Sequence, residues 1–68
     1  MWLTKRGSVL LERAIVERNK AYTNRTGRPL EIIKRRLPYT PRAFDFYVRA
    51  DDDLAVRCFR DFKPVPEE

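Results

Sequence analysis

The chain has 68 residues, the size of one small domain, and carries fifteen lysines and arginines against ten acidic residues, a net charge of +5. It contains one cysteine and no histidine, which excludes an internal disulfide and zinc sites of the usual Cys/His kind. No stretch approaches the roughly 20 apolar residues that span a bilayer, and the N-terminus lacks the apolar run of a signal peptide. We therefore expect a cytoplasmic protein with no membrane contact, no bound metal and no cofactor.

The first predicted elements are a short strand at residues 1–4 and a helix at about residues 8–22. Ser8 is a suitable N-cap for this helix, because a serine hydroxyl can accept a hydrogen bond from an unpaired amide in the first turn. Apolar residues recur at helical spacing and gather into one stripe, while two valines fall together on the opposite side. The stripe consists of Leu10, Leu11, Ala14, Ile15, Ala21 and Tyr22, and the opposite pair is Val9 and Val16.

A polar turn at residues 23–28 leads to a second predicted helix at about residues 29–37. Pro29 favours the first position of a helix, where no amide donor is needed, and Pro38 ends the element. Apolar residues share one face of this helix and basic residues point away from it. The apolar residues are Leu30, Ile33 and Leu37, and the basic ones are Lys34, Arg35 and Arg36.

From Phe44 onward the hydrophobic period changes to two, which predicts β structure. Two alternating runs, at about residues 44–50 and 54–61, flank three aspartates and indicate an antiparallel hairpin with a three-residue loop. In that register every inward pair is apolar: Ala50 with Leu54, Val48 with Val56, and Phe46 with Cys58. The outward face then carries aromatic and arginine side chains, namely Tyr47, Arg49, Arg57 and Phe59.

Together these elements predict an α+β fold. Two helices pack on the antiparallel hairpin, with the short N-terminal strand beside it, because a lone hairpin is marginal and its apolar face has to be covered. The single small domain is expected to span residues 1–62. Residues 63–68 contain two prolines and two glutamates and are expected to form a flexible acidic tail.

The charge is concentrated in the first part of the chain. Residues 1–42 carry eleven basic residues against three acidic ones, a net +8, whereas residues 43–68 carry four against seven, a net −3. Eleven of the fifteen basic residues are arginine, whose planar fork suits phosphate recognition. We therefore expect a small DNA- or RNA-binding protein that contacts phosphates through an arginine-rich, helix-turn-helix-like surface. The candidate contacts are Arg18, Lys20, Arg25, Arg28, Lys34, Arg35 and Arg36.

Other interpretations of these surfaces stay open. The turn at residues 23–28 is longer than the usual 3–4 residues of a groove-reading helix-turn-helix, and a basic face can simply be solvated. The outward face of the hairpin is a secondary contact face, where aromatics beside arginines suit stacked single-stranded bases, a protein contact or a plain surface.

The alternative function is a protein-interaction module, such as a regulator, an inhibitor or an assembly subunit, that docks on an acidic partner surface. A homodimer is a further candidate. We do not expect an enzyme, because the chain lacks histidine and any glycine-rich phosphate loop.

Overall fold

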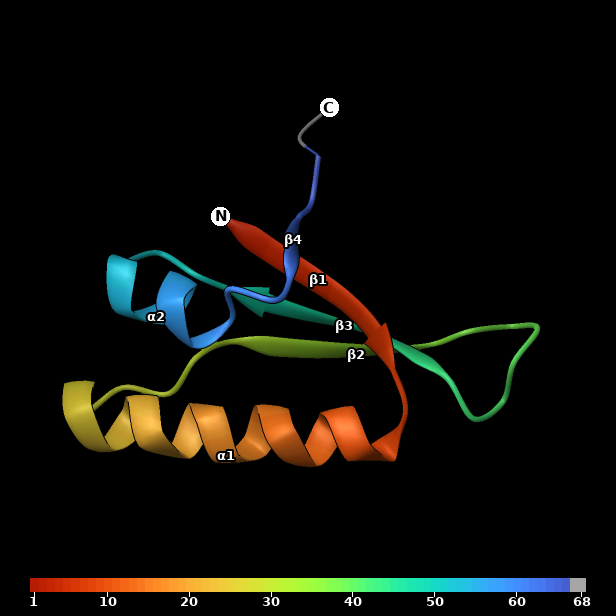
Figure 1. Cartoon of the computed structure of the whole chain (residues 1–68), viewed down its shortest axis with the longest axis horizontal. Coiled ribbons are helices and arrows are strands. Elements are labelled where there is room, and N and C mark those ends of the chain that lie inside the picture. Colours follow the sequence, from red (N-terminus) through yellow and green to blue (C-terminus); the bar gives the residue numbers. More distant parts are fainter. Residues whose placement is uncertain (67–68) are drawn as a thin grey trace.

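The computed structural model describes residues 1–66, which form two helices and four strands (Figure 1). In chain order they are β1 (Trp2–Gly7), α1 (Val9–Thr26), β2 (Ile32–Arg36), β3 (Phe44–Arg49), α2 (Asp53–Cys58) and β4 (Lys63–Pro64). The strands form one antiparallel sheet in the order β2-β3-β1-β4. This is the split β-α-β arrangement, in which β3 lies between the two parallel strands that α1 connects. The predicted α+β class is confirmed.

The first helix begins where the sequence predicts. The Ser8 hydroxyl accepts a hydrogen bond from the Leu10 amide at 3.3 Å, which confirms its N-cap role. The helix continues four residues beyond the expected end, because Gly27 adopts a left-handed φ of 77° and donates its amide to the Thr23 carbonyl at 2.8 Å.

The predicted apolar stripe of α1 is only partly correct. Ile15 and Tyr22 are buried against the sheet, and Val9 and Val16 are exposed on the other side as expected. Leu10, however, is 76% exposed. It lies about 140° around the helix from Ile15 at 100° per residue, too far to reach the core.

The predicted helix at residues 29–37 is wrong, because residues 32–36 form β2. The chain leaves α1 at Gly27, and the Leu30 amide donates to the side-chain oxygen of Asn19 at 2.8 Å rather than to a helical carbonyl. The β-branched pair Ile32 and Ile33 then favours an extended backbone, which pairs along its whole length with β3. Backbone pairing with a distant strand thus outweighs a short helical pattern.

The second strand of the predicted hairpin, at residues 54–61, is also wrong. Asp52 caps α2 instead, since its side chain accepts a hydrogen bond from the Ala55 amide at 2.7 Å. Ala55 and Phe59, four residues apart, are both fully buried, which is helical spacing. The partners of β3 are therefore β1 and β2, and Cys58 packs half-buried at the edge of the core.

Both ends of the described chain enter the sheet. The predicted N-terminal strand is confirmed and extends to Gly7. Lys63–Pro64, expected to lie in a flexible tail, form β4 beside β1, and the following Val65 amide donates to the Trp2 carbonyl at 2.9 Å. The acidic end of that tail, Glu67 and Glu68, lies outside the described residues.

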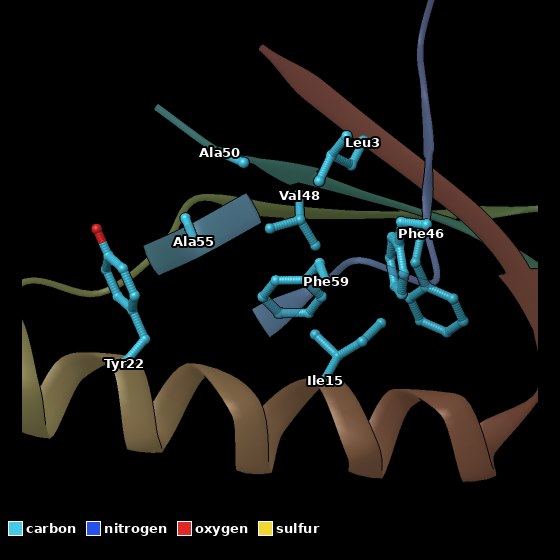
Figure 2. Packing of buried hydrophobic residues seen from close by; sticks show 9 residues of the cluster. Leu3, Ile15, Tyr22, Phe46, Val48, Ala50, Ala55 and Phe59 are labelled. Atoms are coloured by element: carbon cyan, nitrogen blue, oxygen red, sulfur yellow. The ribbon is translucent and has the colours of Figure 1, made fainter. Parts of the chain in front are cut away.

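The core lies between the helices and one face of the sheet (Figure 2). Ile15 points from α1 toward Phe59, which follows α2, and Tyr22 points from α1 toward Ala55 of α2. The Phe59 ring meets the Phe62 ring edge-on, with centroids 5.1 Å apart. The buried residues are Leu3, Ile15, Tyr22, Phe46, Val48, Ala50, Ala55, Phe59 and Phe62. Since both helices contribute to this single cluster, they cover the same face of the sheet and leave the other one open.

Gly7 marks a close approach at the junction of β1 and α1. A Cβ on this residue would lie 2.7 Å from the Cβ of Leu11, which cannot swing away as a side-chain tip can. Gly7→Ala is therefore expected to lower the free energy of unfolding by about 1–3 kcal/mol, measured by urea denaturation. In a Leu11→Gly background, which removes that Cβ, the same change should cost less; an equal cost in both backgrounds would show that the contact with Leu11 is not the cause.

Candidate functional site

The face of the sheet opposite the helices is open. Residues that directly oppose each other in an antiparallel pair share a face, so the register separates the buried side chains from the open ones. Leu3 opposes Val48 on the buried face, and their neighbours along each strand therefore point the other way. The open face carries Trp2, Thr4 and Arg6 from β1, Ile33 and Arg35 from β2, Asp45, Tyr47 and Arg49 from β3, and Lys63 from β4.

A shallow groove of about 260 Å³ crosses this open face. It is lined by Trp2, Ile33, Arg35, Tyr47 and Val65, which come from or follow all four strands. Trp2 and Tyr47 are diagonal neighbours on adjacent strands, and Ile33 directly opposes Tyr47 and is 44% exposed. The groove therefore offers two aromatic side chains and an isoleucine to solvent on a rigid sheet.

Basic side chains lie on the open face, and one of them, Arg35, lines the groove. The open face carries four cations, Arg6, Arg35, Arg49 and Lys63. Arg6 pairs with Asp45 and Arg49 with Asp51, which leaves Arg35 and Lys63 without an ion pair among residues 1–66. The Arg6 Nε donates to Asp45 at 3.0 Å, and this hydrogen bond raises the pKa of the Arg6 guanidinium. Arg35 lies in the groove itself and, within residues 1–66, forms no ion pair.

The structure does not bring the predicted basic cluster onto one surface. Arg35 alone lies on the open face, while the others lie on or near α1 or on the helix-covered side of β2. Lys20 and Arg25 are exposed on α1, Arg28 follows it, and Arg36 ends β2 opposite Phe44. Because residues 32–36 are a strand, the expected helix-turn-helix-like surface does not exist.

Two members of that cluster hold the fold together. The Arg18 guanidinium donates to both carboxylate oxygens of Asp61, at 2.7 and 3.3 Å, and lies 5.5 Å from the centre of the Phe59 ring. Lys34 pairs with Glu12 at 3.0 Å and tethers β2 to α1. Both cations form ion pairs within the protein, so their charges are less available to attract a partner.

Only two of the four residues predicted for the secondary contact face lie together on the open face. Tyr47 and Arg49 lie on the open face, but Arg57 lies on α2 and Phe59 is fully buried in the core, because the second strand of the hairpin does not form. Trp2, Ile33 and Val65 were missed as groove residues. The alternation of buried Leu3 with Trp2 and Thr4 is a sequence signal for Trp2 alone, since Ile33 and Val65 reach the groove only through the pairing of β2 and β4 in the sheet.

A second hollow, of about 240 Å³, lies between the C-terminal end of α1 and the start of α2. The Tyr22 hydroxyl donates a short hydrogen bond to Asp52, which raises the pKa of Tyr22 and lowers that of Asp52. Asp51 pairs with Arg49 and with the amino group of Met1, each at 3.3 Å. These polar groups pair with one another, and their contacts connect neighbouring elements of the fold. None of the groups named here is left free to bind a ligand.

No family model matches the chain, and no curated protein or solved structure matches it either. Among the described residues no helix is long and apolar enough to cross a membrane. A fold by itself does not specify a function, so the open face and its chemistry carry the functional argument.

Asp61 provides a pH-dependent test of the Arg18 ion pair. Hydrogen bonds from Arg18, and a weaker contribution from Lys5 at 2.8 Å, lower the pKa of Asp61 from 3.8 to about 2. Its carboxylate therefore stabilises the fold above the unfolded-state pKa, and this contribution is lost as the pH falls from 3.8 to about 2. We expect Asp61→Asn to cost about 1 kcal/mol near neutral pH, the upper end for partly exposed pairs.

Urea denaturation of wild type and Asp61→Asn across this pH range measures the effect. The difference between the two proteins should shrink toward zero at a pH of about 2. A difference that stays constant down to that pH would assign the loss to packing rather than to the charge.

Proposed function

We propose that the protein binds single-stranded nucleic acid across the open face of its sheet. In this proposal unpaired bases stack on Trp2 and Tyr47, and the sugar-phosphate backbone lies along Arg35 and the other cations of that face. The observation that carries it is the groove in which two aromatic side chains and an arginine are presented together on the uncovered side of the sheet.

The rings of Trp2 and Tyr47 suit nucleic-acid bases, because the rings and the bases all have flat, apolar faces. Stacking of a base on an aromatic side chain contributes about 1–3 kcal/mol and tolerates any sequence. Trp2 and Tyr47 project from paired strands at the centre of the sheet, so little backbone ordering opposes binding. A duplex hides the faces of its bases, and these side chains would gain nothing from it.

The surrounding charge supplies the attraction to phosphate. Within residues 1–66, Arg35 in the groove and Lys63 elsewhere on the open face form no ion pair, and Arg6 and Arg49 lie on the same face, each paired with one aspartate. A guanidinium binds phosphate oxygens through two parallel hydrogen bonds, and release of counterions makes such binding weaken with salt. The single half-buried thiol of Cys58 fits a reducing compartment such as the cytoplasm.

The positions of the two helices argue against a helix that binds in a DNA groove. Both helices pack on the covered face of the sheet, and the outward side of α1 carries Val9 and Val16 among Glu12, Arg13 and Glu17. A side of this mixed character offers no run of cations to a duplex. The basic segment recognised in the sequence contributes to the proposed site only through Arg35.

Trp2 is the only tryptophan of the chain and reports directly on this site. We expect single-stranded DNA or RNA to quench its fluorescence, with a dissociation constant of about 1–100 μM at low salt, and a duplex of the same sequence to bind more weakly. Tyr47→Ala should weaken binding about tenfold, whereas Tyr47→Phe should retain it because the ring is kept. Arg35→Gln should lower the slope of log K against log salt by about one.

Arg57→Gln is the matched control, since it removes the same charge from the exposed surface of α2 on the covered side. Its salt slope should equal that of the wild type. Absence of quenching at low salt, or equal effects of Arg35→Gln and Arg57→Gln, would refute the proposal. A dimer in sedimentation that Tyr47→Ala dissociates would instead assign the open face to self-association.

A further inference from the structure

The loop between β2 and β3, residues 37–43, extends well beyond the end of the sheet (Figure 1). Near its tip, Tyr39 is 93% exposed, the highest value among the large hydrophobic side chains of the described residues. An aromatic ring that contacts almost nothing in its own fold contributes little to stability. Because binding residues are often carried on loops, the exposed ring is accessible to an external partner.

Internal contacts give this loop a defined shape. The Leu37 amide donates to the Ala43 carbonyl at 3.4 Å, and the Ala43 amide donates to the Thr40 carbonyl at 3.0 Å. Pro38 and Pro41 each fix a backbone φ angle beside the tip. A loop that is already shaped loses little conformational entropy when a ligand binds.

The loop continues the positive charge of the open face. Residues 32–44 contain four basic residues and no acidic one, a net +4. Lys34 is paired with Glu12, and Arg36 lies on the helix-covered side of β2. This leaves Arg35 in the groove before the loop and the exposed Arg42 near the end of the loop, so Tyr39 lies between these two cations along the chain.

We propose that this loop is a second contact for the bound strand, in which Tyr39 stacks a further base and Arg42 contacts a phosphate near it. The inference rests on the proposed function, because it lengthens the same site. Arg35 and Tyr39 are four residues apart, so their Cα atoms lie at most about 14 Å from each other. At 3.4 Å per stacked nucleotide, at most about four nucleotides span this distance. The preferred ligand is therefore a strand longer than the groove alone can hold.

A length series of labelled oligothymidine and oligouridine tests the loop by fluorescence anisotropy, from about four to about sixteen nucleotides. We expect wild-type affinity to increase with length and then level off. Tyr39→Ala should bind the shortest oligomers like the wild type and the longer ones about tenfold more weakly, the loss of one stacked base. Arg42→Gln should show the same length dependence with a smaller loss.

Matched controls keep the two proposals separable. Leu10→Ala removes another highly exposed apolar side chain, from α1, and Arg57→Gln removes another exposed cation; both should follow the wild type at every length. If Tyr39→Ala matches the wild type at all lengths while Tyr47→Ala binds weakly, the loop contact is wrong and the sheet site stands. If the wild type binds no oligomer, the proposed function fails, and the loop contact with it. An unchanged thermal midpoint confirms that Tyr39→Ala remains folded.

Discussion

The pairing of β1 with β3 at the centre of the sheet determines the rest of the molecule. Six residue pairs, from Trp2 with Arg49 to Gly7 with Phe44, set which side chains face the helices and which face solvent. A slip of one residue would place Trp2 in the core and Leu3 outside. Since β2 pairs on β3 and β4 on β1, the same register also positions Ile33 and Val65. The hydrophobic core and the open groove are thus two consequences of one set of backbone hydrogen bonds.

The sequence predicted those elements whose signals are local. Ser8 and the long apolar period identify α1, and the strict alternation from Phe44 identifies β3. The predictions for residues 29–37 and 54–61 were wrong because a short apolar run fits both the helical and the strand period. Pairing or packing with a distant part of the chain decides which of the two structures forms. Asp52 illustrates this: an aspartate before an apolar run suits a hairpin loop or a helix N-cap. Its hydrogen bonds with Tyr22 and the Ala55 amide, together with the burial of Phe59, favour the cap.

The candidate site shows a similar division. Tyr47 and Arg49 were identified because both lie on one regular strand, whereas Trp2, Ile33 and Val65 come from three other parts of the chain and meet only through the sheet. Charge density along the sequence was a poorer guide, because neighbouring cations on α1 and β2 point in different directions. Arg18 shows how such a charge is used internally, since its guanidinium is held by Asp61 over the Phe59 ring. A basic segment becomes a basic surface only where the fold turns its side chains the same way.

The position of β2 has a consequence for how copies of this chain meet at high concentration. Within the described residues β2 is an edge of the sheet, and an edge strand offers unpaired backbone groups to any other strand, which is a common route to aggregation. Three consecutive cations, Lys34, Arg35 and Arg36, occupy this edge. Two such edges brought side by side would repel each other. The cations of β2 therefore protect the sheet from joining edge to edge with its own copies.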